Sequence, residues 1–461
     1  MIVMKFGGTS VESAAAIERV AGIAGAAKAR APLVVVSAMG KTTNKLLAAA
    51  DHAANARLDD ALKAAAELEE FHRREASKVT REEDRPLLDA HLESHFAALR
   101  ETLSAVERAG ALTPPLWDEV TSFGERLSSY IVALAFRFFG LKANHLDARE
   151  VMITDSRHTQ AQPHYVRTYA RLAELVPPML KEGILVMGGF IGATSDGETT
   201  TLGRGGSDFS ASIAGAGIGA EEIQIWTDVD GMLTCDPRIV PGGHLVKTIS
   251  FAEAAELAYF GAKVLHPATV LPAIEMKIPV WILNSRRPGV RGTKIVADSV
   301  HCENPVKSIA CKRNITVVNI QSLRMLMAHG FLRRIFEVFD RYETAVDMVT
   351  TSEVSVSLTI DDAARLAAIR EELSRIAEVT VLENQALVCL VGDAIGETPG
   401  VGARIFAALR GWNVRMVSQG ASRLNLSFIV DGKDMAPAVE SLHREFFSTL
   451  DPEVFEEAQA V

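Results

Sequence analysis

The sequence predicts an α/β domain built around a mainly parallel sheet, followed by two ferredoxin-like βαββαβ modules. Three observations support this fold class. Residues 1–297 alternate short β-rich runs with helical patterns, which is typical of a parallel sheet covered by helices. Charged residues and glycines at 286–292 break that pattern. The segment after the break repeats one order of strands and helices.

The strands of the first domain are expected where short apolar runs end in glycine or polar residues. These runs lie at residues 2–5, 33–37, 184–187, 223–227 and 280–283. A long helical insertion is expected between the second and third runs, at about 45–139. Its last helix repeats apolar residues at steps of three and four, and Glu125 lies partly off that stripe, among small residues.

The repeat after the break pairs two short strands around a turn in each copy. Residues 346–349 and 354–360 are echoed by 414–417 and 424–430, with a helix before and after each pair. We therefore divide the chain into a domain at 1–297 and modules at 306–383 and 384–461. A strand at 306–311 directly precedes one at 315–320. It either opens the first module or completes the second, which would insert one module into the other.

Composition excludes several classes of protein. The chain has 461 residues, 48% of them hydrophobic, so it can bury a large core. A formal net charge of −10 disfavours nucleic acid as a partner. The run at 130–139 is too short for a membrane span and contains Arg137, and the first residues lack a signal-peptide pattern, so we expect a cytoplasmic protein. The four cysteines have no CxxC spacing, which predicts reduced thiols rather than disulfides or a zinc site.

The loop at residues 199–208 is the most informative motif. Its glycines remove Cβ atoms so that a ligand can approach the backbone, and Ser207 is expected to cap a helix beginning near Asp208. The start of a helix favours an anion, and Arg204 adds a two-pronged donor for a carboxylate or phosphate. The loop therefore predicts a site for a phosphoryl group.

A second glycine turn follows the first strand. Lys5 is at the carboxyl end of that strand, and Gly7 and Gly8 are expected to offer backbone donors to a phosphate. Two other motifs fail. Residues 40–43 lack the earlier glycine of a P-loop, and residues 228–231 lack the glutamate of a calcium loop. The two glycine turns together indicate phosphoryl transfer.

Five segments, in this order, closely resemble the aspartokinases: residues 5–9, 122–125, 199–208, 226–238 and 251–267. The resemblance runs through nearly the whole chain. Residues 330–332 and 346–356 make it similar in particular to the monofunctional lysine-sensitive type. The resemblance implies an amino-acid-kinase fold followed by two ACT modules, without a fused dehydrogenase. It also implies transfer of a phosphoryl group from ATP, with Mg²⁺, to the side chain of L-aspartate. This reaction is the first step of lysine, threonine and methionine biosynthesis.

The resemblance implies specific roles. Lys5 would stabilise the transferring phosphoryl group, and Asp208 would orient Lys5 or the metal shell. Arg204 would clamp the substrate's α-carboxylate, while Glu125 would pair with its ammonium group. Further substrate-binding candidates are Thr9, Ser37, Thr43 and Ser207. Nucleotide-binding candidates are the backbone N–H groups of Gly7, Gly8, Gly205 and Gly206, with Thr227, Asp228, Arg238 and Lys263. Metal ligands are not identified.

An L-lysine effector is expected in the first module, because Asp347 there corresponds to Arg415 in the second and only the former attracts a cation. Its expected site consists of Met325, Gly330, Phe331, Leu332, Val346, Asp347, Ser352 and Glu353. The modules are expected to associate into a homodimer or higher oligomer. Three residues depart from the family pattern: Leu233 and Phe123 replace a frequent aromatic residue and histidine, and Ala328 replaces a usual serine.

Two alternatives stay open. One is a related kinase for a substrate such as N-acetylglutamate, whose acylated nitrogen would not need Glu125. The other is a catalytically silent amino-acid sensor on the same fold, which the presence of Lys5, Arg204 and Asp208 disfavours.

Overall fold

The computed structural model describes residues 1–261, 265, 267–325, 329–393 and 395–457. The chain packs as two compact units. Unit 1 comprises Met1–Met232 and His266–Ala297, and unit 2 comprises Leu233–Leu265 and Asp298–Val461. The segment Leu233–Leu265 thus packs with the repeat that follows residue 297. The sequence predicts instead that this segment belongs to the domain at 1–297.

Unit 1 is built on a sheet of parallel strands in the order β3-β4-β2-β1-β7-β10, with β11 antiparallel beside β10. The expected strands are confirmed as β1, β2, β4, β7 and β10, while β3 and β11 are additional. A separate hairpin consists of β5 and β6. The strands are β1 (Ile2–Phe6), β2 (Pro32–Val36), β3 (Ala143–Leu146), β4 (Ile184–Gly188), β5 (Ile191–Ala193), β6 (Thr199–Thr201), β7 (Ile223–Thr227), β10 (Val280–Asn284) and β11 (Thr293–Val296).

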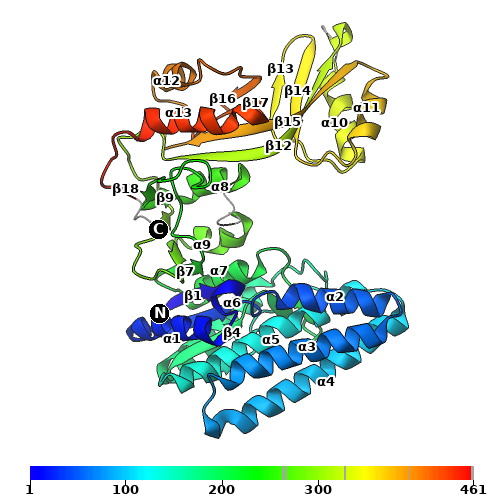
Figure 1. Cartoon of the computed structure of the whole chain (residues 1–461), viewed down its shortest axis with the longest axis vertical. Helices are drawn as coiled ribbons and strands as arrows, with labels where there is room; N and C mark the ends of the chain where they lie inside the picture. Colours follow the sequence, from blue (N-terminus) through cyan, green and yellow to red (C-terminus); the bar gives the residue numbers. More distant parts are fainter. Residues whose placement is uncertain (262–264, 266, 326–328, 394, 458–461) are drawn as a thin grey trace. The chain divides into compact units, whose positions relative to one another are not determined.

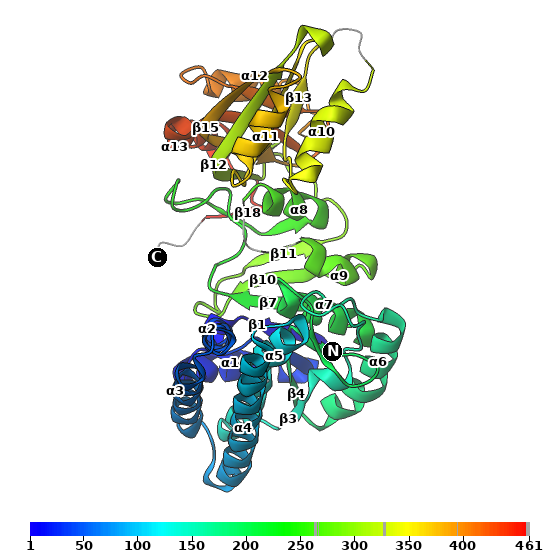
Figure 2. The ribbon, with the colours of Figure 1, turned by 90° about the vertical axis from the view of Figure 1, so that its right-hand side faces the viewer.

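Helices cover both faces of this sheet. On one face α1 and α5 pack against each other, and on the other α6 and α7 do so. The helical insertion consists of α2, α3, α4 and α5, whose long axes run side by side in Figures 1 and 2. The helices are α1 (Ala14–Ala26), α2 (Thr42–Ala54), α3 (Leu58–Ser77), α4 (Arg85–Ala109), α5 (Pro114–Phe138), α6 (Tyr165–Glu182), α7 (Gly206–Ile218) and α9 (Leu271–Glu275).

Unit 2 contains an antiparallel sheet in the order β13-β14-β12-β15-β17-β16. Figure 1 shows α10 and α11 beside one half of it, and α12 and α13 beside the other. The strands are β8 (Leu245–Val246), β9 (Thr248–Ser250), β12 (Ser308–Gln321), β13 (Val349–Thr351), β14 (Ser355–Ile360), β15 (Glu378–Val391), β16 (Met416–Gln419), β17 (Asn425–Asp431) and β18 (Phe455–Glu456). The helices are α8 (Phe251–Tyr259), α10 (Phe331–Arg341), α11 (Leu366–Leu373), α12 (Val401–Ala408) and α13 (Met435–Phe447).

Two long strands, β12 and β15, each serve both modules. The second half of β12 pairs with β14 and with Glu378–Leu382 of β15. The first half, from Ser308 to Lys312, pairs with Leu387–Val391, the part of β15 that also pairs with β17. The strand expected at 306–311 therefore lies in the sheet of the second module, and the first module is inserted between that strand and the remainder of the second.

Helix α8 is anchored to the rest of unit 2 by buried polar contacts. Lys307 and Glu253, both fully buried, form an ion pair at 2.9 Å. Glu253 also closes a capping box with Ser250 at the start of α8. One turn later, Glu256 accepts hydrogen bonds from Ser422 and Asn425. A buried charge is tolerated only when it is paired, so these contacts fix α8 against the modules.

Two expectations from composition can be compared with the structure. All four cysteines are free, and three of them are buried. No described helix combines the length and apolar composition that a membrane span requires.

Candidate active site

A cavity of about 580 Å³ lies in unit 1 where the two glycine turns meet, and we call it the main cavity. This volume is within the usual range for small-molecule sites. The described residues that line it are Lys5, Ser37, Thr43, Trp117, Glu125, Thr159, Gln160, Phe190, Gly203, Arg204, Gly205, Gly206, Ser207 and Asp208. Nine of our site candidates are among these residues, although they come from distant parts of the sequence.

Lys5 and Asp208 connect the two turns. The Lys5 Nζ lies 2.7 Å from Oδ1 of Asp208, and both side chains are mostly buried. Side chains alternate along β1, so Met4 and Phe6 enter the core beside α1 and α5 while Lys5 faces the opposite side, toward α7. Asp208 lies in the first turn of α7. The pair places a cation at the start of that helix, where an anionic ligand is favoured.

The expected cap of this helix is wrong. Helix α7 begins at Gly206, and its N-cap is Gly205 with φ of +72°, a left-handed conformation that glycine adopts without strain. Ser207 is therefore inside the first turn. Its Oγ accepts a hydrogen bond at 3.0 Å from Ser37 instead, which connects the turn after β2 to α7.

Glu125 is directed into the main cavity by the turn after β2. Its Oε1 accepts the Ala38 N–H at 3.0 Å, and Oε2 is buried without a hydrogen-bond partner among the described residues. Helix α5 can approach this turn closely because Gly124 has no Cβ. A Cβ at this position would lie only 2.7 Å from the Cβ of Ala38. Burial raises the pKa of Glu125 to about 8, although the Ala38 N–H and the charge of Lys5 act in the opposite direction.

Two of the four expected phosphate donors are already engaged. The Gly7 N–H extends the pairing of β1 with β7 by donating to Trp226 at 3.3 Å, and the Gly206 N–H closes a turn onto Gly203 at 3.0 Å. The expectation that both groups donate to phosphate is therefore wrong for this state of the chain. Gly8 and Gly205 remain as candidate donors.

Four residues that line the main cavity did not emerge from the sequence: Trp117, Thr159, Gln160 and Phe190. Phe190 has φ of +65°, which is uncommon for an aromatic residue, and its N–H and carbonyl bond to Ser210 and Leu202. The sequence feature that could have indicated Phe190 is the glycine pair Gly188-Gly189, which directly precedes it at the end of an expected strand. A Cβ on Gly189 would lie 2.8 Å from Ser207 Cα.

Asp118 explains how the loop with Thr159 and Gln160 is held. This carboxylate on α5 is fully buried. It accepts hydrogen bonds from the Thr159 N–H, His158 and Thr201. Its spacing of seven residues from Glu125 places it two turns away on the same face of the helix.

The remaining substrate and nucleotide candidates are more scattered. Thr9 is exposed and does not line the main cavity. Thr227 ends β7, the neighbour of β1 in the sheet, and Asp228 follows it. Arg238 is in unit 2 and forms a bidentate pair with Asp236 in its own loop. Lys263 lies outside the described residues.

The candidate effector residues surround the short strand β13 and the start of α10. Asp347 accepts the Tyr259 hydroxyl at 2.9 Å and lies 3.5 Å from the Lys312 Nζ, which also pairs with Asp361. Burial raises the pKa of Asp347, and the neighbouring Asp361 raises it further.

The other effector candidates differ in exposure. Gly330, with φ of +76°, is the N-cap of α10. Phe331 is buried, Met325 and Val346 are half-buried against the core of the first module, and Leu332, Ser352 and Glu353 are exposed.

The three departures from the family pattern have different surroundings. Phe123 is fully buried and packs edge-on against His95, so it belongs to the core. Leu233 forms an isolated bridge with Leu245 in unit 2. Ala328 lies outside the described residues.

Comparison with known proteins identifies the same two parts. The model of the amino acid kinase family matches residues 1–284, and that of the ACT domain matches residues 388–446. Lysine-sensitive aspartokinase 3 of Escherichia coli (strain K12) is 39% identical over 460 residues, which cover 97% of this chain and 99% of that protein.

Two solved structures of E. coli aspartokinase III are similar over the same length. The complex with lysine and aspartate, in the T-state, has a TM-score of 0.84 at 36% identity and covers 97% of this chain and 99% of that one. The complex with aspartate and ADP, in the R-state, has a TM-score of 0.78 at 36% identity and covers 97% and 100%. With this similarity through both units and the expected fold in each, the chain belongs to the aspartokinase family.

Proposed function

We propose that the protein transfers the γ-phosphoryl group of ATP to the side-chain carboxylate of L-aspartate in the main cavity. The observation that carries this proposal is the Lys5–Asp208 ion pair, which brings both glycine turns to one cavity that also contains Arg204 and Glu125. A new bond forms between a carboxylate oxygen and phosphorus while the bond from phosphorus to the β,γ-bridging oxygen breaks. The products are 4-phospho-L-aspartate and ADP.

The residues of the main cavity suit this reaction because it requires no general base. A carboxylate is already a nucleophile, so the protein must align two anions and neutralise charge on the transferring group. Lys5 supplies the positive charge, and Asp208 fixes its position. Gly8 and Gly205 supply backbone donors, while Ser37, Thr43 and Ser207 border the acceptor side.

Arg204 and Glu125 would hold the two ends of the amino acid. The guanidinium of Arg204 matches the α-carboxylate, and the carboxylate of Glu125 matches the ammonium group. Glu125 favours aspartate over N-acetylglutamate, because its buried Oε2 would face an uncharged amide nitrogen in the latter. The complete set of charged groups disfavours a silent sensor.

Mg²⁺ would neutralise phosphate charge when bound. Among the described residues no group of three or more His, Cys, Asp or Glu side chains is arranged to hold a metal ion. This fits an ion carried mainly by the nucleotide phosphates, since Mg²⁺ usually takes only one or two protein carboxylates. Asp208, in the first turn of α7, is the carboxylate of the main cavity that would help to hold this ion.

The nucleotide would extend from the phosphates toward Thr227 and Asp228, at the carboxyl end of β7. Arg238 and Lys263 stay predicted nucleotide ligands, as does Thr9 for the substrate. Assembly through the modules also stays a prediction, supported by the partly exposed apolar side chains of Leu332, Phe336 and Phe406 on α10 and α12. The cytoplasmic location is likewise a prediction from the sequence.

The direct test is an ADP-release assay in which hydroxylamine traps the acyl phosphate. We expect ADP and hydroxamate in equal amounts with L-aspartate and neither product with N-acetylglutamate. The Lys5→Met variant should lose about 100-fold or more in kcat, the range for removing one preorganised charge-stabilising donor. Lys28→Met, which removes an exposed lysine after α1, is the control. Aspartate-independent ADP release, or full turnover by Lys5→Met, would contradict the proposal.

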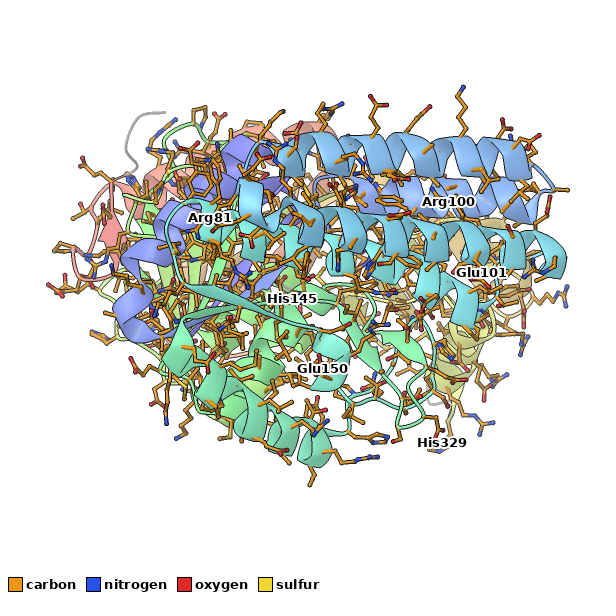
Figure 3. The ribbon with its side chains drawn as sticks, turned by 90° about the horizontal axis from the view of Figure 1, so that it is seen from below. Arg81, Arg100, Glu101, His145, Glu150 and His329 are labelled. Carbon is orange, nitrogen blue, oxygen red and sulfur yellow. The ribbon has the colours of Figure 1, made fainter. Side chains whose placement is uncertain are left out.

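The raised pKa of Glu125 predicts how aspartate binding varies with pH. Below about pH 8 the empty cavity holds a protonated Glu125, so binding an ammonium group must first release that proton. Aspartate KM should therefore fall about tenfold for each pH unit from 6 to 8 and then level off. Glu125→Gln should raise KM and remove this dependence, whereas Glu101→Gln on the outer face of α4 (Figure 3) should leave it intact. A wild-type KM that is constant over this range would exclude the role of Glu125.

We also propose that L-lysine binds the first module as a feedback effector. The E. coli relative is named lysine-sensitive, and its T-state structure contains lysine. In this chain Asp347 would receive one ammonium group, and the start of α10 after Gly330 would receive the carboxylate. Lys312 and Tyr259 already contact Asp347, so the effector's ammonium must displace or join them.

Removing the carboxylate of Asp347 should weaken inhibition by lysine. The Asp347→Asn variant should need at least about 10-fold more lysine for half-inhibition, because a charged hydrogen bond contributes about 1.5–3 kcal/mol. Asp431→Asn, which removes the carboxylate paired with Arg415 in the second module, should not shift the curve. Inhibition curves that shift equally in both variants, or no inhibition of the wild type, would argue against this site.

A further inference from the structure

A second cavity, of about 150 Å³, lies in unit 1 at the carboxyl ends of β3 and β4. Ligands of open α/β sheets bind beyond the carboxyl ends of the strands, so this location resembles that of the main cavity. We call it the histidine cavity. Its lining residues are His91, His95, Arg126, Ser129, His145, Asp147, Ala148, Arg149, Gly188 and Ile191. Figure 3 shows His145 beneath the long helices, with Glu150 farther from them.

The histidine cavity gathers five basic side chains. The His91 and His95 rings stack with centroids 3.9 Å apart on α4, and His145 bonds to Ser129 at 2.9 Å. Arg126 lies over the Phe123 ring. Its Nη1 donates to Glu119, but its Nε is buried without a hydrogen-bond partner among the described residues. An unsatisfied buried donor is costly, so this Nε indicates an acceptor that is not part of the chain.

The carboxylates that pair with the two arginines of the histidine cavity, Asp147 and Glu119, leave the Arg126 Nε unsatisfied. Arg149 engages both oxygens of Asp147, with its side chain and its backbone N–H. Glu119, one-third exposed, pairs with the outer nitrogen of Arg126. Burial, with a smaller contribution from nearby positive groups, lowers the pKa of His91 to about 3 and that of His95 to about 4. With neutral imidazoles, Arg126 and Arg149 are matched in formal charge by Glu119 and Asp147, and the buried Arg126 Nε is the arginine donor left without a partner among the described residues.

We propose that the histidine cavity binds a small oxyanion of the size and charge of inorganic phosphate. The volume is several times what a single water molecule needs, so the cavity can admit a tetrahedral ion of five heavy atoms. Donors come from the Arg126 Nε on α5 and from His145 on β3, whose Nε2 is engaged with Ser129 so that Nδ1 can carry the proton of the neutral ring. The single N–H groups of His91 and His95 already donate to the backbone carbonyls of Arg126 and His91. A metal ion is disfavoured, since no described cluster of three or more ligating side chains is arranged to hold one.

The histidine cavity is separate from the proposed reaction but adjacent to it. Glu125 and Arg126 are consecutive on α5, and they line the main cavity and the histidine cavity respectively. Gly188, at the end of β4, packs against Glu125 and also lines the histidine cavity. The two cavities share no lining residue, so the phosphate proposal and the proposed aspartate chemistry can fail separately.

Calorimetric titration of the full chain with inorganic phosphate tests the proposal, in the presence of saturating ADP so that the main cavity is occupied. We expect one phosphate per chain with a dissociation constant of about 1 mM or below, competition by sulfate, and no competition by chloride at equal ionic strength. Arg126→Met should weaken binding at least about 10-fold. His145→Leu should also weaken it, which provides a second variant if the first does not fold.

Two control variants complete the experiment. Arg100→Met removes an arginine of α4 outside the histidine cavity (Figure 3) and should bind phosphate as the wild type does. Arg204→Gln disables the proposed main cavity and should also retain binding. The proposal is overturned if no heat of binding appears at about 10 mM phosphate. It is equally overturned if binding survives in Arg126→Met and His145→Leu but is lost in Arg204→Gln, because the ion would then occupy the main cavity.

Discussion

The ion pair between Lys5 and Asp208 is the contact on which the organisation of the main cavity depends. It connects the first strand to the first turn of α7, across about 200 residues of sequence, at 2.7 Å. Without Asp208, Lys5 would face only backbone N–H groups. Its positive charge would then be less well stabilised, and its side chain would be mobile. With Asp208 beside it, the ammonium is fixed where the helix start already favours negative charge.

A second constraint acts from α5. Gly124 permits close approach, Glu125 accepts the Ala38 N–H, and Ser128 donates to the Ser37 carbonyl at 2.8 Å. These three contacts fix the turn after β2 against the helix. The carboxylate that is fixed in this way is buried and has one free oxygen, so its affinity for an ammonium group is linked to its own protonation. The same helix directs the next residue, Arg126, into the histidine cavity.

Much of this arrangement could be predicted from the sequence. Lys5, Arg204 and Asp208 were identified because glycine turns at strand ends and helix starts have a clear physical signature. The cap was misplaced by two residues because several consecutive residues in this loop suit a helix start, and only the left-handed φ of Gly205 decides between them. The Gly7 N–H was misassigned because sequence does not show where strand pairing ends.

Other parts needed the three-dimensional structure. Trp117 and Thr159 carry no motif, and they reach the main cavity only through the buried Asp118 and the packing of α5. The grouping of residues 233–265 with the modules rests on the contacts of Glu253 and Glu256, which are remote in sequence from their partners. The histidine cavity likewise combines side chains from α4, α5 and β3 that show no common pattern along the chain.

The most direct test of the central claim is a double-mutant cycle of Lys5→Met and Asp208→Asn, with kcat measured in the aspartate-dependent assay. If Asp208 acts by fixing Lys5, the double variant should be little slower than Lys5→Met alone, which corresponds to a large coupling free energy. Rate losses that multiply, so that the double variant is slower by the product of the single effects, would show that the two residues act independently and would contradict the account.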